Sequence, residues 1–158
     1  MDWGGWATFG LGATVALTGM MLLAQMAGLS RMDLPLMLGT MFSDVPDRAR
    51  VLGFVFHLFN GQVFALFYAA AFSLLGLATW WLGAIFGLFH GLAALTVIVP
   101  LLPGAHRRMA SERGGPRLDA VLEPPGFLAL NYGRETPAVT LVAHVIYGVL
   151  LGIFLTPG

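Results

Sequence analysis

Three histidines lie inside long apolar stretches of this chain, and two of them share a local pattern. After both His57 and His144, a side chain that can form hydrogen bonds follows three residues later, and a glycine follows four residues later. His90 lies in a third apolar stretch and directly precedes a glycine. Because hydrocarbon tolerates ionisable side chains poorly, an intramembrane histidine is a candidate functional residue with a partner to be found. These three positions are therefore the first candidates for chemistry.

One hypothesis is a cofactor site. His57 and His144 can supply the two axial ligands of a b-type haem held between helices, and His90 can replace either of them. Asn60 and Tyr147 would then support the ligands or contact the haem propionates. A three-histidine site of the kind that zinc or copper accepts is a variant. The spacing itself has little specificity, because membrane haem sites have no short diagnostic motif.

The alternative hypothesis is structural. Each neutral histidine would hydrogen-bond a neighbouring helix, together with Asn60, Gln62 and Tyr147. Such bonds contribute about 0.6 kcal/mol on average and up to about 1–2 kcal/mol in membranes. The sequence leaves both hypotheses open, and the structural role is the more common one for such residues.

Two other sets of residues have ordinary explanations. Methionine is a gap-filler in apolar packing, and the methionines near the beginning of the chain are too dispersed to indicate a copper site. They are Met20, Met21, Met26, Met32, Met37 and Met41. His106 stands beside Arg107 and Arg108, so we expect it to be solvated at the membrane interface.

The composition is that of an integral membrane protein. Of the 158 residues, 58% are hydrophobic and 10% are charged, with a mean hydropathy of +0.82. Soluble domains are about 45–50% apolar and about 25% charged. The chain has no cysteine or lysine, which excludes disulfides, thiolate metal sites and Schiff-base chemistry. Its net charge of zero gives no indication of nucleic-acid binding.

Four apolar stretches are long enough to span a bilayer, since a core of about 30 Å needs about 20 helical residues. They cover residues 6–28, 51–77, 80–102 and 137–156, and none contains Asp, Glu, Lys or Arg. Tryptophans at 3, 6, 80 and 81 are typical of an aromatic belt at the interface. The prediction is an all-α, four-helix transmembrane bundle that forms a single membrane domain over residues 1–158.

The arginines predict the orientation. All eight lie in two connections, residues 29–50 and 103–136. The positive-inside rule makes both connections cytoplasmic and places both termini outside the cytoplasm. The first connection contains a predicted short helix over residues 32–42, in which Asp33 is the capping residue and Pro35 lies in the first turn. It is too short to span the membrane, so we expect an interfacial or re-entrant helix.

Small residues recur at spacings of three and four in all four stretches, and such faces let membrane helices approach closely. They include Gly12, Ala16 and Gly19 in the first stretch, Gly53, Gly61, Ala65 and Ala69 in the second, Gly83, Gly87 and Gly91 in the third, and Gly148 and Gly152 in the fourth. The histidines lie on or beside these faces, so they should point into the bundle. His57 and His144 should lie about 10 Å from the cytoplasmic ends of their helices, and His90 about 5 Å deeper.

Three segments carry a resemblance to a known family. They are Met32–Gly39, Gly53–His57 with Phe64–Tyr68, and Ala143–Gly148. In these segments the chain resembles a family of small bacterial four-helix integral membrane proteins of unknown function. The resemblance covers nearly the whole chain and is weakest over residues 104–136. It implies four spans and a bacterial cytoplasmic membrane, and it supplies no activity and no site residues.

The leading hypothesis for function is non-enzymatic. No hydrolase, zinc-protease, P-loop or dinucleotide motif is present. We therefore expect an accessory or scaffolding subunit that contacts the lipid bilayer and packs against other membrane subunits or copies of itself. The alternatives are an electron-transfer protein that binds haem b or a metal through its histidines, and an oligomeric channel or small-solute carrier.

Overall fold

The computed structural model describes residues 2–110 and 121–157, and two of the arginines used for orientation, Arg113 and Arg117, lie outside them. In chain order the helices are α1 (Trp3–Met26), α2 (Leu34–Gly39), α3 (Pro46–Leu75), α4 (Trp80–Ala93), the π-helical segment η1 (Ala94–Ile98), α5 (Val99–Ala105), the 3-10 segment η2 (Phe127–Tyr132) and α6 (Thr136–Phe154). Across the described residues, regular structure is helical apart from one isolated bridge between Met109 and Leu122. The predicted all-α class is confirmed.

Four helical stretches are long and apolar enough to cross a membrane. They are Trp3–Met26, Pro46–Leu75, Trp80–Ala105 and Thr136–Phe154. The third is continuous through α4, η1 and α5. It widens to a π-helix just before Pro100, because proline has no N–H to donate and its ring clashes with the carbonyl four residues earlier. The fold therefore defines a multi-pass membrane protein.

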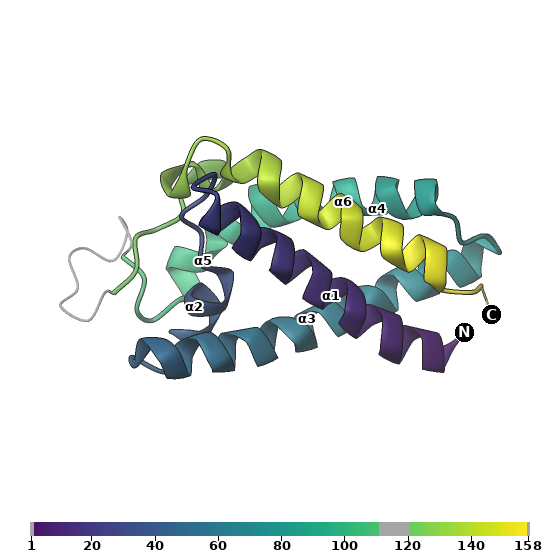
Figure 1. Ribbon diagram of the computed structural model, residues 1–158, viewed down its shortest axis with the longest axis horizontal. Coiled ribbons are helices and arrows are strands. Elements are labelled where there is room, and N and C mark those ends of the chain that lie inside the picture. Colours follow the sequence, from purple (N-terminus) through teal and green to yellow (C-terminus); the bar gives the residue numbers. More distant parts are fainter. Residues whose placement is uncertain (1, 111–120, 158) are drawn as a thin grey trace.

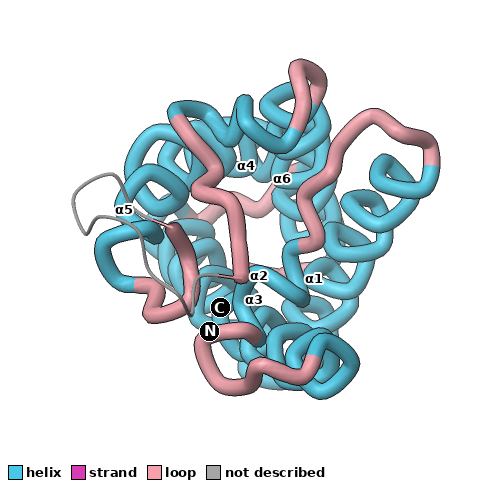
Figure 2. Tube along the Cα trace, turned by 90° about the vertical axis from the view of Figure 1, so that its left-hand side faces the viewer, coloured by secondary structure: helices cyan, strands magenta, loops and turns pink. Residues whose placement is uncertain are grey.

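The long helices form a bundle with a consistent neighbour order. α6 packs between α4 and α1, and α1 packs against α3 on its other side (Figure 2). α3 and α4 follow each other in the chain and meet near their shared turn, where the rings of Phe72 and Phe86 stack at 5.6 Å. Both termini lie at one end of the bundle, and α2 and α5 lie towards the other (Figure 1).

Glycine contacts bring α4 and α6 close together. A Cβ atom added to Gly83 would lie 2.0 Å from the carbonyl oxygen of Gly148, and one added to Gly148 would lie 2.0 Å from that of Gly83. A Cβ on Gly87 would lie 2.3 Å from the carbonyl oxygen of His144. The predicted small-residue faces of these two helices thus pack against each other, and side chains larger than hydrogen are excluded there.

The end of the bundle away from the termini is closed by three segments, residues 30–45, 106–110 and 121–135, which we call the end cap. The predicted short helix is present within it as α2. Asp33 accepts a hydrogen bond from the backbone N–H of Leu36 at 2.9 Å and another from Nε of Arg50 in α3 at 2.9 Å. α2 lies alongside the first turns of α3, where the backbones of Gly39 and Gly53 meet.

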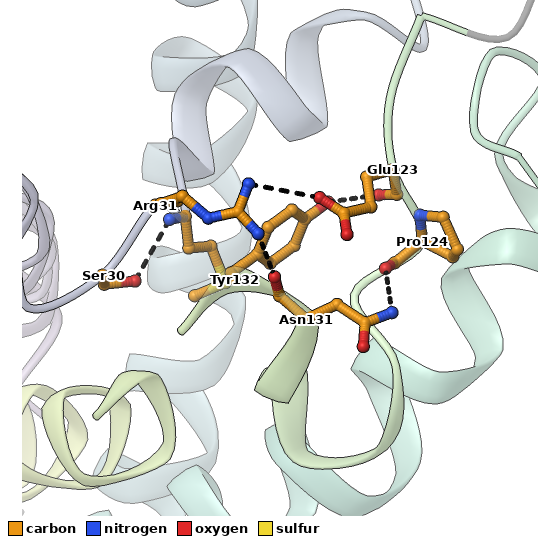
Figure 3. Close-up of polar contacts among 7 residues, drawn as sticks. Ser30, Arg31, Glu123, Pro124, Asn131 and Tyr132 are labelled. Atoms are coloured by element: carbon orange, nitrogen blue, oxygen red, sulfur yellow. Dashed lines mark hydrogen bonds and ion pairs between the residues drawn. The ribbon is translucent and has the colours of Figure 1, made fainter. Parts of the chain in front are cut away.

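Polar contacts tie residues far apart in sequence together within the end cap (Figure 3). Arg31 donates to the carboxylate of Glu123 at 3.3 Å and to the backbone carbonyl of Asn131. The hydroxyl of Tyr132 donates to the carbonyl of Glu123 at 2.6 Å, and burial raises the pKa of Tyr132 to about 12, which keeps that donor protonated. These contacts fix the two connections against each other.

His106 is buried in the end cap, with 2% of its surface exposed, so the prediction of a solvated interfacial residue was wrong. Its Nδ1 accepts a hydrogen bond from the N–H of Arg108 at 3.1 Å, and its Nε2 donates to the carbonyl of Met37 at 2.9 Å. The guanidinium of Arg108 donates to the carbonyl of Thr40 at 2.7 Å. The neighbouring arginine, which suggested exposure, instead helps His106 to hold the end of α2.

We expect this contact to depend on pH. Burial lowers the pKa of His106 below its ordinary value of about 6.5. His106 therefore binds a proton more readily when it is released from the carbonyl of Met37 than when it is buried against α2. The stability of the buried arrangement should fall as pH falls below about 6.5, by at most about 1.4 kcal/mol per pH unit.

Hydrogen exchange of residues 36–43, corrected for the intrinsic pH dependence of exchange, measures this loss. Exchange should accelerate in acid in the natural protein. A His106→Gln variant, which does not titrate, should show a flatter dependence. An equal acceleration in both proteins would show that another group is responsible.

Candidate functional site

A cavity of about 130 Å³ lies inside the bundle, between the membrane helices and α2. All five residues singled out by the sequence line it, and they come from three helices. His57 and Asn60 belong to α3, His90 to α4, and His144 and Tyr147 to α6. The three histidines therefore point into the bundle as expected.

Two of the histidines are in direct contact. The rings of His90 and His144 lie 4.7 Å apart between centroids and are nearly perpendicular, at 82°. Glycine makes this approach possible, because a Cβ on Gly91 would lie 3.1 Å from the Cβ of His144. The close packing of α4 against α6 thus positions the histidine pair.

Hydrogen bonds fix the orientation of this pair. Nδ1 of His144 lies 2.8 Å from the carbonyl oxygen of Thr140, which can only accept, so Nδ1 carries the proton. Nε2 of His144 is then unprotonated and has a free lone pair. Nδ1 of His90 lies 3.4 Å from the hydroxyl of Tyr68, and its ring packs on Phe64 with centroids 4.0 Å apart. Of these two rings, His144 therefore presents an unprotonated Nε2 that can donate a lone pair to a ligand.

His57 is different, because its Nε2 is fully buried and has no hydrogen-bond partner among the described residues. The hydroxyl oxygen of Thr140, which also lines the cavity, is buried without a partner as well. A buried polar atom left unsatisfied costs about 1–3 kcal/mol, so such atoms need an explanation. Both atoms belong to cavity-lining residues, so a polar occupant of the cavity would satisfy them, whereas the unsatisfied side-chain oxygens of Gln62 and Ser73 lie outside it.

The structural hypothesis accounts for only part of this arrangement. His90 contacts Tyr68 on another helix, but His144 bonds its own helix, and Nε2 of His57 has no partner in the part of the chain that the structure describes. Stronger bonds between helices come from two residues that the structural hypothesis named beside the histidines, Tyr147 and Gln62. Tyr147 donates to the carbonyl of Gly61 at 2.6 Å.

Gln62 is the second such residue. Its side-chain amide donates to the backbone carbonyl of Ala7 at 3.0 Å. The backbone carbonyl of Gln62 accepts a hydrogen bond from the indole N–H of Trp6 at 2.9 Å. The sequence pattern placed Trp6 in an interfacial belt and gave no indication that its indole joins α1 to α3.

The haem hypothesis meets a size problem. Pockets for cofactors and drug-sized ligands are usually about 300–1,000 Å³, several times larger than this cavity. His90 and His144 are in contact, so no macrocycle fits between them. Haem ligation by His57 and His144 stays a prediction that requires the helices to separate. Among the described residues, no group of three or more His, Asp or Glu side chains is close enough to hold a metal ion.

Three methionines are part of the cavity wall, which the sequence did not reveal. Met21 of α1, Met32 in the connection before α2, and Met37 of α2 all line it, and each is at most 4% exposed. Their spacing along the chain is irregular. They line the same cavity because the chain folds back after α1, so that α2 and the residues before it lie at the cavity that the histidines line. Only the tertiary arrangement brings thioether and imidazole groups to one cavity.

Comparisons with protein-family models, with curated proteins and with solved structures gave no match. The class of this protein therefore rests on its four apolar spans, and its site rests on the geometry of the cavity.

Proposed function

We propose that this chain is a non-enzymatic accessory or scaffolding subunit of a membrane assembly, and that the outer face of α1 is the surface that contacts its partner. The observation that carries the proposal is the open space beside two glycines of α1. A Cβ added to Gly12 or Gly19 would meet no atom of the described residues within 4 Å, so these glycines are not needed for packing among them. Ala16 lies on the same face, one helical turn from each of them.

The other small-residue faces serve the bundle itself. Gly83 and Gly148 pack α4 against α6, and Gly61 packs against Thr14 of α1. In lipid, small residues favour association because backbones can approach closely. A small-residue face left open on α1 is therefore suited to a second membrane helix, from another subunit or from a second copy of this chain.

The size of the native complex tests the proposal. A Gly12→Ile, Gly19→Ile double variant adds bulk to the open face without an internal clash. It should fold normally but migrate at a smaller size than the natural protein after gentle extraction from native membranes. An Ala93→Ile variant adds the same kind of bulk on an exposed face of α4 and should leave the complex intact. A natural protein that is only a free monomer would refute the proposal.

We further propose a bacterial cytoplasmic membrane as the location, with both termini outside the cytoplasm. The family resemblance supports the membrane. The positive-inside rule supports the orientation, because the described arginines lie in the end cap or in the first turns of α3, and both termini lie at the opposite end of the bundle (Figure 1).

The absence of cysteine makes the orientation simple to test, since any introduced cysteine is unique. In intact cells, an impermeant maleimide should label a Thr156→Cys variant and should spare an Asp44→Cys variant. The reverse pattern would show that the termini are cytoplasmic.

A further inference from the structure

The cavity gathers two kinds of soft or borderline metal ligand and no negative charge. Imidazole comes from His57, His90 and His144, and thioether sulfur comes from Met21, Met32 and Met37. No carboxylate is among the described residues that line the cavity. The complete donor set is therefore neutral.

We propose that this cavity binds a single Cu(I) ion through a mixed set of histidine and methionine ligands. Soft sulfur ligands favour Cu(I), zinc and iron–sulfur clusters, and imidazole also suits copper. Ca²⁺ and Mg²⁺ require oxygen ligands, usually carboxylates, which this cavity lacks. A monovalent ion also places less charge in a low-dielectric interior than a divalent one.

The orientation of the histidines supports this assignment. A metal-binding histidine usually donates its other ring N–H to a carbonyl, which fixes the ring and directs the free nitrogen at the metal. His144 does this through Nδ1, 2.8 Å from the carbonyl oxygen of Thr140, and its ring contacts that of His90. Two imidazoles on α4 and α6 thus lie next to each other before any ion arrives.

The unsatisfied Nε2 of His57 is the second, independent observation. A neutral imidazole nitrogen that is buried without a hydrogen-bond partner is costly, and a metal ion is one way to satisfy it. The three imidazoles alone are not close enough to form a site. The thioethers supply the remaining ligands, since methionine side chains are unbranched and adaptable.

The volume also agrees with a small occupant. About 130 Å³ equals the share of roughly four water molecules in the liquid. This space admits a single ion without opening the bundle. The inference does not depend on the accessory role proposed above, because an isolated chain contains every ligand.

Competition with a chromophoric Cu(I) chelator tests the proposal. The purified protein in mild detergent is mixed, under reducing and anaerobic conditions, with the Cu(I) complex of bicinchoninate. We expect the natural protein to remove one Cu(I) per chain. Leucine replaces methionine with little change in volume, so Met21→Leu and Met37→Leu should retain the fold. Each should weaken Cu(I) binding by about tenfold or more, since even supporting groups change metal affinity by about 10–100-fold.

Matched variants separate a site from loose association. Met26 is 75% exposed and lies outside the cavity, so Met26→Leu should bind Cu(I) as the natural protein does. His57→Gln should weaken binding while thermal unfolding shows that the bundle is intact. No removal of Cu(I) from the chelator, an equal loss in Met26→Leu, or unchanged binding in the Met21, Met37 and His57 variants would each overturn the proposal. Stoichiometric Zn²⁺ binding of equal strength in a parallel titration would overturn the assignment to Cu(I).

Discussion

A Gly148→Leu variant should fail to pack α4 against α6 and should lose at least about 3 kcal/mol of stability. Overpacking a well-packed core usually costs about 1–3 kcal/mol, when side chains can shift. Here a Cβ would lie 2.0 Å from the carbonyl oxygen of Gly83 and 2.9 Å from the backbone nitrogen of Gly87. Backbone atoms cannot move aside alone, so the two helices would have to separate and lose their van der Waals contact.

Unfolding in mixed micelles of mild detergent and dodecyl sulfate, followed by circular dichroism, measures this loss. Gly19→Leu is the matched control, because the same side chain meets nothing within 4 Å there. The purified monomer of that variant should unfold like the natural protein. Equal stability of Gly148→Leu and Gly19→Leu would contradict the close packing of α4 and α6.

A Gly53→Leu variant should release α2 from α3 while the four spans stay folded. A Cβ on Gly53 would lie 1.8 Å from the carbonyl oxygen of Pro35 and 2.6 Å from the backbone nitrogen of Gly39. Helix α2 has six residues, and an isolated helix of this length is unstable in solution. Its position therefore depends on contact with α3, and the cavity loses part of its wall when that contact is lost.

Labelling of a cysteine at Leu38 reports this release, since Leu38 is 9% exposed in the docked helix. Leu38→Cys should react slowly with a maleimide in the natural background. With Gly53→Leu the rate should rise about tenfold for each 1.4 kcal/mol of docking energy lost. A Gly104→Leu background is the control, because a Cβ there meets no atom of the described residues within 4 Å. Slow labelling in all three backgrounds would show that α2 does not depend on this contact.

The spans and their packing faces could be predicted because local properties determine them. Uninterrupted apolar stretches without charges specify membrane helices, and glycines at spacing four mark the faces where Gly83 meets Gly148. A local signal also determines the start of α2, since Asp33 caps the helix as predicted. The start of α3 was less clear. It begins at Pro46, five residues before the predicted span, because polar residues can continue a helix beyond the apolar stretch.

The end cap could not be predicted in the same way. His106 is buried because a carbonyl of α2 and the backbone of Arg108 satisfy both of its ring nitrogens. The partner in α2, 69 residues away along the chain, is not recognisable from the residues around His106. The same reason explains why Met32 and Met37 were dismissed as copper ligands. Their distance from the histidines depends on how the chain folds back after α1, and a non-local contact of this kind leaves no periodic pattern in the sequence.

The most direct test of the accessory role is photo-crosslinking from the outer face of α1 in native membranes. Because the chain has no cysteine, a benzophenone maleimide can be attached at a single Gly12→Cys residue, with Ala93→Cys on α4 as the comparison. We predict that the probe at Gly12 yields an adduct of one defined size, larger than the 16.9 kDa chain, and that the probe at Ala93 does not. Recovery of the unmodified monomer from both positions, or the same adducts from both, would contradict the proposal that α1 contacts a partner.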